Sequence, residues 1–418
     1  MARGDGPRRY ASCAATAALV AIGMDPARAQ TALDDQVRAS YPPPEYKPIG
    51  VDLGMGDSLL LFPKAEVRVT HTENLFREGS GRVADQIVTF APSLDLRSDW
   101  DNHAFEAGVR VVHARHVDNP DENYIDVVGR LRGKIDVTED DLLDLEASHG
   151  RLHEERGSID DVDEQEPTIF YLTTGKLIAQ HQGGAVLLRA TGKVDRLDFT
   201  DNGPVDNDDR DRVESELRLR AGYEIVEAVQ PFVEVAVNDR TFDRATDTDG
   251  IRRGSDGWEV LAGNTFDLSA VTFIEAAAGY RRQTFEEPTF EPVSGLTFNS
   301  RAVWNATDLM TFSLRVERQI LETTSVTSSA ITSTDATIGL DYLPLDHLLA
   351  TTRLGYGEDD FEGQGGTDER WRFEFGLEYL IGSNYVLGAS YVQSRRVSSD
   401  DADDFIANDV IVRFGSQL

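Results

Sequence analysis

Apolar and polar residues alternate one by one along much of this chain. In residues 214–225, ESELRLRAGYEI, the charged residues Glu214, Glu216, Arg218 and Arg220 share one parity, and leucine, alanine, tyrosine and isoleucine occupy the other. A β-strand places successive side chains on opposite faces, so this stretch predicts a strand with one charged and one apolar face. Such an apolar face packs on a soluble core or contacts lipid.

The same alternation recurs from about residue 63 to the C-terminus. Residues 124–137, 309–320 and 370–381 show it clearly. We count roughly 18 such segments of about 10 to 15 residues, the length that a tilted strand needs to cross a bilayer. No long helical pattern lies between them.

Connections of two kinds alternate along the chain. The short ones are residues 98–102, 138–141, 180–184, 305–308, 343–346 and 381–384. The long, acidic ones are residues 157–167, 201–212, 243–257, 357–370 and 398–404. Outer-membrane barrels have short periplasmic turns and longer outer loops. The pattern therefore predicts an all-β protein, a transmembrane antiparallel up-and-down β-barrel of 16–18 strands with 18 favoured, whose apolar face meets lipid.

Aromatic residues lie on the apolar parity, mostly near the ends of segments. They are Trp258, Phe298, Trp304, Tyr342, Tyr356, Trp371, Tyr379 and Tyr385. This placement is typical of the aromatic girdles at membrane interfaces, although packing in a soluble β core is the alternative. The chain ends on an apolar residue, Leu418, and such an end is commonly recognised by barrel-assembly machinery.

The N-terminus has the features of a secretory signal peptide. A basic start, an apolar stretch at residues 13–24 and the small residues ARA at 27–29 predict a signal over residues 1–29. The only cysteine, Cys13, lies inside it, so we expect a mature chain without disulfides.

Residues 30–62 form a proline-containing N-terminal segment before the predicted barrel of residues 63–418. The sequence YPPPEYKP at 41–48 favours extended chain without regular pairing. A plug in the lumen, a periplasmic tether and an unordered leader are three roles that the sequence leaves open.

Composition excludes some classes of function. The formal net charge of −33 and pI of about 4.5 argue against nucleic-acid binding, which needs a basic surface. The apolar fraction of 40% suits a chain with much polar lumen and loop. No run of about 18 apolar residues follows the N-terminal region, so no transmembrane helix is expected.

No catalytic, cofactor or resident metal site is predicted. The chain contains no G-x-S-x-G motif, and the stretch REGSGR at 77–82 lacks the Lys-Ser/Thr and helix of a phosphate loop. His149 and His153 could ligate zinc from one face of a helix, but on a strand they lie about 13 Å apart. We therefore expect a protein that is not an enzyme.

Acidic loops could bind Ca²⁺ or Mg²⁺ weakly and bridge lipopolysaccharide phosphates. The candidate carboxylates are Asp160, Asp161 and Asp163 in one loop, and Asp206, Asp208, Asp209 and Asp211 in another. The spacing, glycine and terminal glutamate of an EF-hand are absent, so solvated charged loops are the favoured interpretation.

Charged residues on the inward parity are the candidate functional residues. They are Glu214, Glu216, Arg218, Arg220, Glu275, Arg301, Arg315, Glu317, Arg353, Arg370, Arg372 and Glu374. Basic residues at the bilayer midplane cost about 2–4 kcal/mol each, so these side chains must face water or partners. They either pair across strands and brace a narrow lumen, or line a polar pore that orients a solute.

The chain resembles the outer-membrane barrel family called beta-barrel porin 2, found mainly in alphaproteobacteria. The stretches that carry the resemblance are residues 46–76, 207–225, 231–243, 250–269, 279–288, 318–324 and 394–401. The resemblance implies an outer-membrane location and a link with exopolysaccharide biosynthesis or export, and it assigns no catalytic or binding residue. THTENLF at 70–76 departs from the aromatic-Asp-Asp pattern expected before its Asn, and Leu418 replaces the commoner terminal Phe.

The sequence thus predicts a porin-like conduit for polar solutes in the bacterial outer membrane, with an association with exopolysaccharide export implied by the family. The alternative function is a closed structural or adhesive barrel whose acidic loops bind cations. The expected partners are outer-membrane lipid and lipopolysaccharide, the barrel-assembly machinery and polysaccharide-export components, with no nucleic acid.

Overall fold

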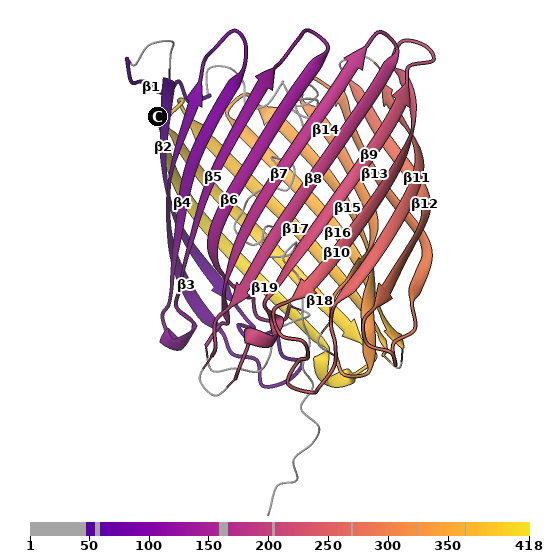
Figure 1. Ribbon diagram of the computed structural model, residues 1–418. Coiled ribbons are helices and arrows are strands. Elements are labelled where there is room, and N and C mark those ends of the chain that lie inside the picture. The colour runs from indigo at the N-terminus through magenta and orange to yellow at the C-terminus, as the bar shows by residue number, and fades with distance from the viewer. Residues whose placement is uncertain are drawn as a thin grey trace, which may run out of the picture.

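A closed wall of eighteen antiparallel strands forms the protein (Figure 1). The computed structural model describes residues 47–54, 59–158, 166–202, 205–268, 271–323, 325–363 and 365–418. The wall strands are β2 (Leu59–Thr72), β3 (Asp85–Ser98), β4 (Ala104–His116), β5 (Tyr124–Asp136), β6 (Asp141–His153), β7 (Ile169–Gly183), β8 (Val186–Phe199), β9 (Arg212–Tyr223), β10 (Val229–Phe242), β11 (Ser255–Asp267), β12 (Thr272–Phe285), β13 (Val293–Thr307), β14 (Met310–Leu321), β15 (Ser328–Leu345), β16 (Leu348–Gly363), β17 (Thr367–Ile381), β18 (Tyr385–Ser398) and β19 (Phe405–Gln417).

Each wall strand pairs with its neighbours in sequence, and the last strand closes on the first. Val412 of β19 lies opposite Val69 of β2, which leaves no open edge in the wall. A two-residue strand, β1 (Val51–Asp52), adds to β2 near its start. The helical turns in the described ranges are η3 (Pro120–Glu122), η4 (Asp208–Arg210) and η5 (Asp401–Asp403). None of the helices among the described residues is long and apolar enough to cross a membrane.

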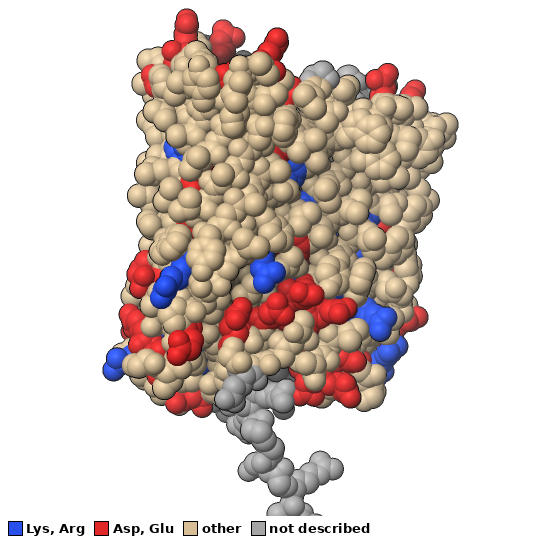
Figure 2. All heavy atoms as spheres, turned by 90° about the vertical axis from the view of Figure 1, so that its right-hand side faces the viewer, with Lys and Arg blue, Asp and Glu red and all other residues tan. Residues whose placement is uncertain are grey.

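The alternation of the sequence becomes an outer apolar face and an inner polar face. On β10, Val235 and Val237 are 44% and 50% exposed, whereas Glu234 and Ala236, which alternate with them, are each only 3% exposed. Figure 2 shows few charged side chains in the middle band of the outer surface, while acidic groups gather near one rim. An outer surface of exposed valine and leucine suits lipid, so the predicted barrel and the direction of its apolar face are confirmed.

The two rims differ in their connections, as the sequence predicted. All six predicted short connections join wall strands at the rim where the C-terminus lies, which we call the turn rim (Figure 1). Two short connections, residues 224–228 and 268–271, were missed because neither contains a strong turn motif. The longer loops lie at the opposite rim, which we call the loop rim.

The prediction of a long loop at residues 357–370 is wrong. Residues 357–370 are mostly strand, because β16 continues to Gly363 and β17 begins at Thr367. Their acidic residues suggested a solvated loop, but alternate ones turn inward and pair: Asp359 is fully buried and accepts hydrogen bonds from Arg370. Charge density therefore concealed a strand extension.

The wall begins slightly earlier than predicted. β2 starts at Leu59 rather than at residue 63, and Phe62 is buried beneath the guanidinium of Arg97. The predicted signal peptide of residues 1–29, with Cys13, and residues 30–46 of the N-terminal segment lie outside the described residues.

Candidate solute path through the barrel

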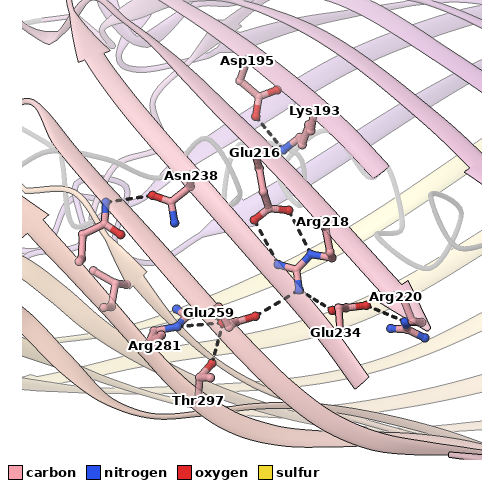
Figure 3. Close-up of polar contacts among 12 residues, drawn as sticks. Lys193, Asp195, Glu216, Arg218, Arg220, Glu234, Asn238, Glu259, Arg281 and Thr297 are labelled. Atoms are coloured by element: carbon pink, nitrogen blue, oxygen red, sulfur yellow. Dashed lines mark hydrogen bonds and ion pairs between the residues drawn. The ribbon is translucent and has the colours of Figure 1, made fainter. Parts of the chain in front are cut away.

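The inner face of the wall carries clusters of charged side chains, and one large cluster spans β8 to β13. Alternation places Glu214, Glu216, Arg218 and Arg220 of β9 on this face, because Leu217 and Leu219 between them face outward at 48% and 53% exposure. We call the cluster built around Arg218 and Arg220 the arginine network (Figure 3).

Arg218 connects three strands. Its guanidinium donates to Glu216 of the same strand at 3.1 Å, to Glu234 of β10 at 2.5 Å and to Glu259 of β11 at 3.1 Å. Figure 3 shows the guanidinium lying among these three carboxylates. One cation thereby holds carboxylates from three strands and fixes their relative positions.

Glu234 and Arg220 extend the network toward β12. Arg220 Nε donates to Glu234 at 2.6 Å, and its Nη1 and Nη2 donate to the two oxygens of Glu275 at 3.0 and 3.2 Å. The Arg220 guanidinium also lies 3.9 Å from the centre of the Phe232 ring. Bidentate pairing and ring stacking both favour arginine over lysine at this position.

Glu259 continues the network on the other side. It accepts a hydrogen bond from Arg281 Nε of β12 at 3.0 Å and another from Thr297 Oγ1 of β13 at 3.0 Å (Figure 3). Thr297 is buried, and its hydroxyl also lies 3.1 Å from the Arg318 carbonyl oxygen, an alternative acceptor for its single proton. The carboxylates of the network are thus satisfied by arginine and hydroxyl donors, as buried charges require.

A second cluster lies on β15 to β17. Arg370 pairs with Asp359 at 2.5 Å and with Asp335 at 3.0 Å, and Arg353 pairs with Asp341 at 2.5 Å. Arg370 and Arg353 belong to the predicted lumen residues, and their acidic partners were not predicted.

The remaining predicted residues occupy separate places on the wall. Arg212 holds Glu214 at 2.8 Å, Arg315 pairs with Glu317 at 2.8 Å, and Arg372 lies 3.6 Å from Glu374. Arg301 faces Glu275 and Arg315 in register, with its guanidinium 4.9 Å from the centre of the Phe273 ring. The twelve predicted side chains therefore belong to several clusters rather than to one ring.

Sequence reasoning missed carboxylates at the centre of these clusters. Glu234, Glu259, Asp335, Asp341 and Asp359 are paired with arginines, yet none was selected. The available signal was their parity: each alternates with outward residues in its own strand. Choosing among same-parity acids needs the register between strands, which alternation alone does not give.

A bent hairpin end reaches into the barrel at the loop rim. We call residues 319–323 and 325–329 the inward segment. β14 pairs with β13 only as far as Arg318, although β13 itself begins at Val293. Beyond Arg318 the chain leaves the wall while remaining paired with β15.

Contacts with β10 and the β10–β11 loop hold the inward segment. Arg240 of β10 donates to the Ile320 carbonyl at 2.9 Å and pairs with Glu322, which also accepts from Ser255 at 3.1 Å. Arg253 donates to the Thr323 carbonyl at 2.9 Å. Because Arg240 shares the inward parity of Glu234, and three strands separate β10 from β14, the inward segment crosses part of the lumen.

A second crossing lies on the other side of the loop rim. In residues 154–158, after β6, Arg156 pairs with Glu122 at 2.7 Å and Glu154 pairs with Arg210. A Cβ at Gly157 would lie 2.6 Å from Arg77 Cβ and 3.3 Å from the Phe405 ring, so this stretch reaches β19. Segments from two sides of the wall thus narrow the loop rim.

The two histidines considered as zinc ligands have separate partners. His149 Nδ1 lies 2.8 Å from Thr173 Oγ1, whereas His153 Nδ1 lies 2.9 Å from Asp126 and its ring stacks on Tyr124. These side chains do not converge on one point.

The acidic loop before β9 is held by a cation of the protein itself. Asp206 and Asp208 pair with Arg244 at 2.8 and 2.9 Å, and Asp209 accepts two hydrogen bonds from Thr248. The exposed carboxylates of Asp201, Asp206 and Asp208 have oxygens within 4.8 Å of one another. Cation binding there stays a prediction, and Asp160, Asp161 and Asp163 lie outside the described residues.

Asp211 closes this loop and has a perturbed acidity. Burial raises the pKa of the Asp211 carboxyl to about 6, although a hydrogen bond from the Phe199 amide at 2.6 Å lowers it. The neighbouring carboxylates of Asp198 and Asp208 raise it further. The group therefore titrates where most aspartates are already ionised.

The chain is similar to several solved structures at low sequence identity. Pseudomonas aeruginosa OpdO is 14% identical with a TM-score of 0.44, covering 86% of this chain and 97% of that one. P. aeruginosa OccK2 (OpdF) in complex with glucuronate is 14% identical with a TM-score of 0.46, covering 86% and 98%. Acinetobacter baumannii OccAB2 is 11% identical with a TM-score of 0.45, covering 86% and 98%.

Family membership comes from the sequence. A search of curated proteins finds no match. The model of the family described as "Putative beta-barrel porin 2" matches residues 43–418, which include all eighteen wall strands and the residues just before them. The chain belongs to the beta-barrel porin 2 family and is a porin-like β-barrel of the bacterial outer membrane.

Proposed function

We propose that the protein is a passive conduit that lets small polar solutes cross the outer membrane. The observation that carries this proposal is the charged inner face, with Arg218, Arg220 and Arg370 each paired across strands. A wall of this kind offers hydrogen bonds and alternating charge to a hydrated solute. No catalytic step is part of the proposal.

The pairing of the charges supports a rigid conduit rather than a flexible one. Arginines that join three strands hold the wall in one shape, so the charges that a solute meets stay at fixed positions. The inward segment and residues 154–158 both narrow the loop rim, which favours small solutes over a polymer. Exopolysaccharide export stays a prediction of the family resemblance, and the partners expected from the sequence stay predictions as well.

The test is single-channel conductance of the mature chain, residues 30–418, in planar bilayers. We expect steady conductance with a salt-dependent ion preference, because paired charges in water are screened by added ions. A chain that gives a heat-modifiable gel shift, and is therefore folded, but never conducts would overturn the conduit and favour the closed structural or adhesive barrel.

The same recording tests the N-terminal segment. Deleting residues 30–58 leaves β2 complete, since that strand begins at Leu59. Conductance that rises on deletion identifies the segment as a plug, whereas equal conductance in both chains identifies it as a tether or leader.

A further inference from the structure

Two arginines face each other at the turn-rim end of the arginine network. Arg189 of β8 lies directly opposite Arg220 of β9 in the strand register. Like charges directly opposite each other destabilise a sheet unless other groups compensate. Arg220 is compensated by Glu234 and Glu275.

Arg189 lacks such compensation within the described part of the chain. Its Nε donates a hydrogen bond to Gln180 Oε1 at 2.9 Å, and no carboxylate oxygen of the described residues lies within 4.0 Å of its guanidinium. Its two terminal nitrogens make no hydrogen bond to the described residues and are not fully buried. Water in the lumen therefore reaches them. The fork of Arg189 thus presents donors to the solute path.

The surroundings of Arg189 are rich in positive charge. The charged groups that act on it most strongly are Arg220, Glu275, Glu234 and Arg301. Counting Arg189 itself, three guanidinium groups therefore face two carboxylates. The oxygens of both carboxylates already accept hydrogen bonds from arginines on β9. Little acceptor capacity is left for Arg189 from the protein.

Aromatic rings support the two neighbouring arginines. Arg220 lies over Phe232 and Arg301 over Phe273, and both rings are buried behind the wall's polar surface. Stacking of this kind restrains the two guanidinium groups and holds their positive charge close to Arg189.

We propose that Arg189, with Arg220 and Arg301 behind it, binds the carboxylate of a small organic anion on its way through the barrel. The planar fork of arginine matches the two oxygens of a carboxylate. The carboxylate of the solute would supply the negative acceptor that the wall near Arg189 lacks. This site rests on the proposed conduit and deepens it by naming a solute class, which the net charge of −33 alone would not suggest.

The experiment measures block of single-channel current by gluconate, with uncharged sorbitol as the matched solute. We expect gluconate to reduce the current in a saturable way, and Arg189→Gln to raise the half-blocking concentration about tenfold. Arg189→Lys keeps the charge without the fork and should lie between the two. Inorganic phosphate tests whether the site accepts any oxyanion.

Arg372→Gln is the control variant, because it removes an inward arginine on β17 whose side chain is 56% exposed and remote from β8. An equal change in Arg189→Gln and Arg372→Gln would show that only the overall field matters and would overturn the site. Block that is unchanged in Arg189→Gln would overturn it as well.

Equilibrium dialysis of radiolabelled gluconate against the folded barrel separates the site from the conduit. Binding that depends on Arg189 in a barrel without conductance would keep the site and refute the conduit. Conductance without any Arg189-dependent binding or block would keep the conduit and refute the site.

Discussion

Replacing Glu234 by glutamine removes one negative charge from the centre of the arginine network. The carboxylate is 3% exposed and accepts hydrogen bonds from Arg218 at 2.5 Å and from Arg220 at 2.6 Å. Glutamine has nearly the same shape, so the change tests the charge with little change in packing.

The magnitude follows from what each arginine keeps. Breaking a buried pair by removing one partner costs about 3–5 kcal/mol, because the remaining charge loses its compensation. Arg218 retains Glu216 and Glu259, and Arg220 retains Glu275. Arg218 is also partly open to lumen water, which screens its charge. We therefore expect Glu234→Gln to lower the free energy of unfolding by about 2–3 kcal/mol.

Glu374→Gln is the matched control. Its carboxylate is 36% exposed and lies 3.6 Å from Arg372, whose side chain is 56% exposed. Exposed pairs contribute about 0–1 kcal/mol, so this variant should unfold almost as the parent does. Both substitutions remove one inward negative charge, so their effects on the total charge of the lumen are identical.

The assay is equilibrium unfolding by guanidinium chloride of the barrel folded in phospholipid vesicles, followed by tryptophan fluorescence and by gel mobility. Equal losses of unfolding free energy in both variants would refute the reasoning, since pairing and burial would then have no bearing on stability. A gain in stability for Glu234→Gln would refute it more strongly.

Three further expectations follow from the same structure. Glu322→Gln should release the inward segment, because it removes the ion pair with Arg240. Maleimide should then label a Ser325→Cys reporter faster in the otherwise cysteine-free mature chain. An unchanged labelling rate would contradict the anchoring role of Glu322. Val235→Arg should lower the free energy of unfolding in vesicles by about 2–4 kcal/mol if Val235 faces the bilayer midplane. Thr241→Arg, near the loop rim, should lower it by about 0–1 kcal/mol. Equal losses would contradict the assigned membrane band. Asp211 has a pKa raised to about 6, so its contribution to loop stability is complete below about pH 4 and is lost as pH rises through 6. An NMR signal of the Asp211 carboxyl carbon that titrates near pH 4 would contradict this.

The wall of the barrel could be predicted from the sequence because one rule governs it. Residues such as Leu217 and Glu216 alternate by parity, and a lipid-facing strand tolerates no lapse in that alternation across the bilayer. The short turns were found for a related reason, since each interrupts the alternation briefly. The loop of residues 357–370 was misassigned because acidic composition was given more weight than the alternation that runs through it.

The contacts inside the lumen depend on information that no single strand carries. Arg220 meets Glu234 because β9 and β10 pair with those residues opposite each other, and it meets Glu275 two strands further on because all three side chains are long. A shift of register by two residues would keep every side chain on its face and change every ion pair between the two strands. Parity therefore predicts which residues face the lumen, and register decides which of them interact.

The inward segment shows why the narrowest part of such a barrel is the hardest to predict. Up to Val316 apolar and polar residues alternate as in the rest of the wall. Arg318 on the apolar parity and the adjacent Ile320 and Leu321 then break the pattern, but they do not show which way the chain turns. The chain leaves the wall because Arg240 offers a buried guanidinium that Glu322 and the Ile320 carbonyl can satisfy from across the lumen. If the segment stayed in the wall, that arginine would lose its ion pair and keep only the weaker influence of Glu214, which lies opposite it in the register, and of Glu216. The bend of one strand is thus determined by a charge on another, four strands away.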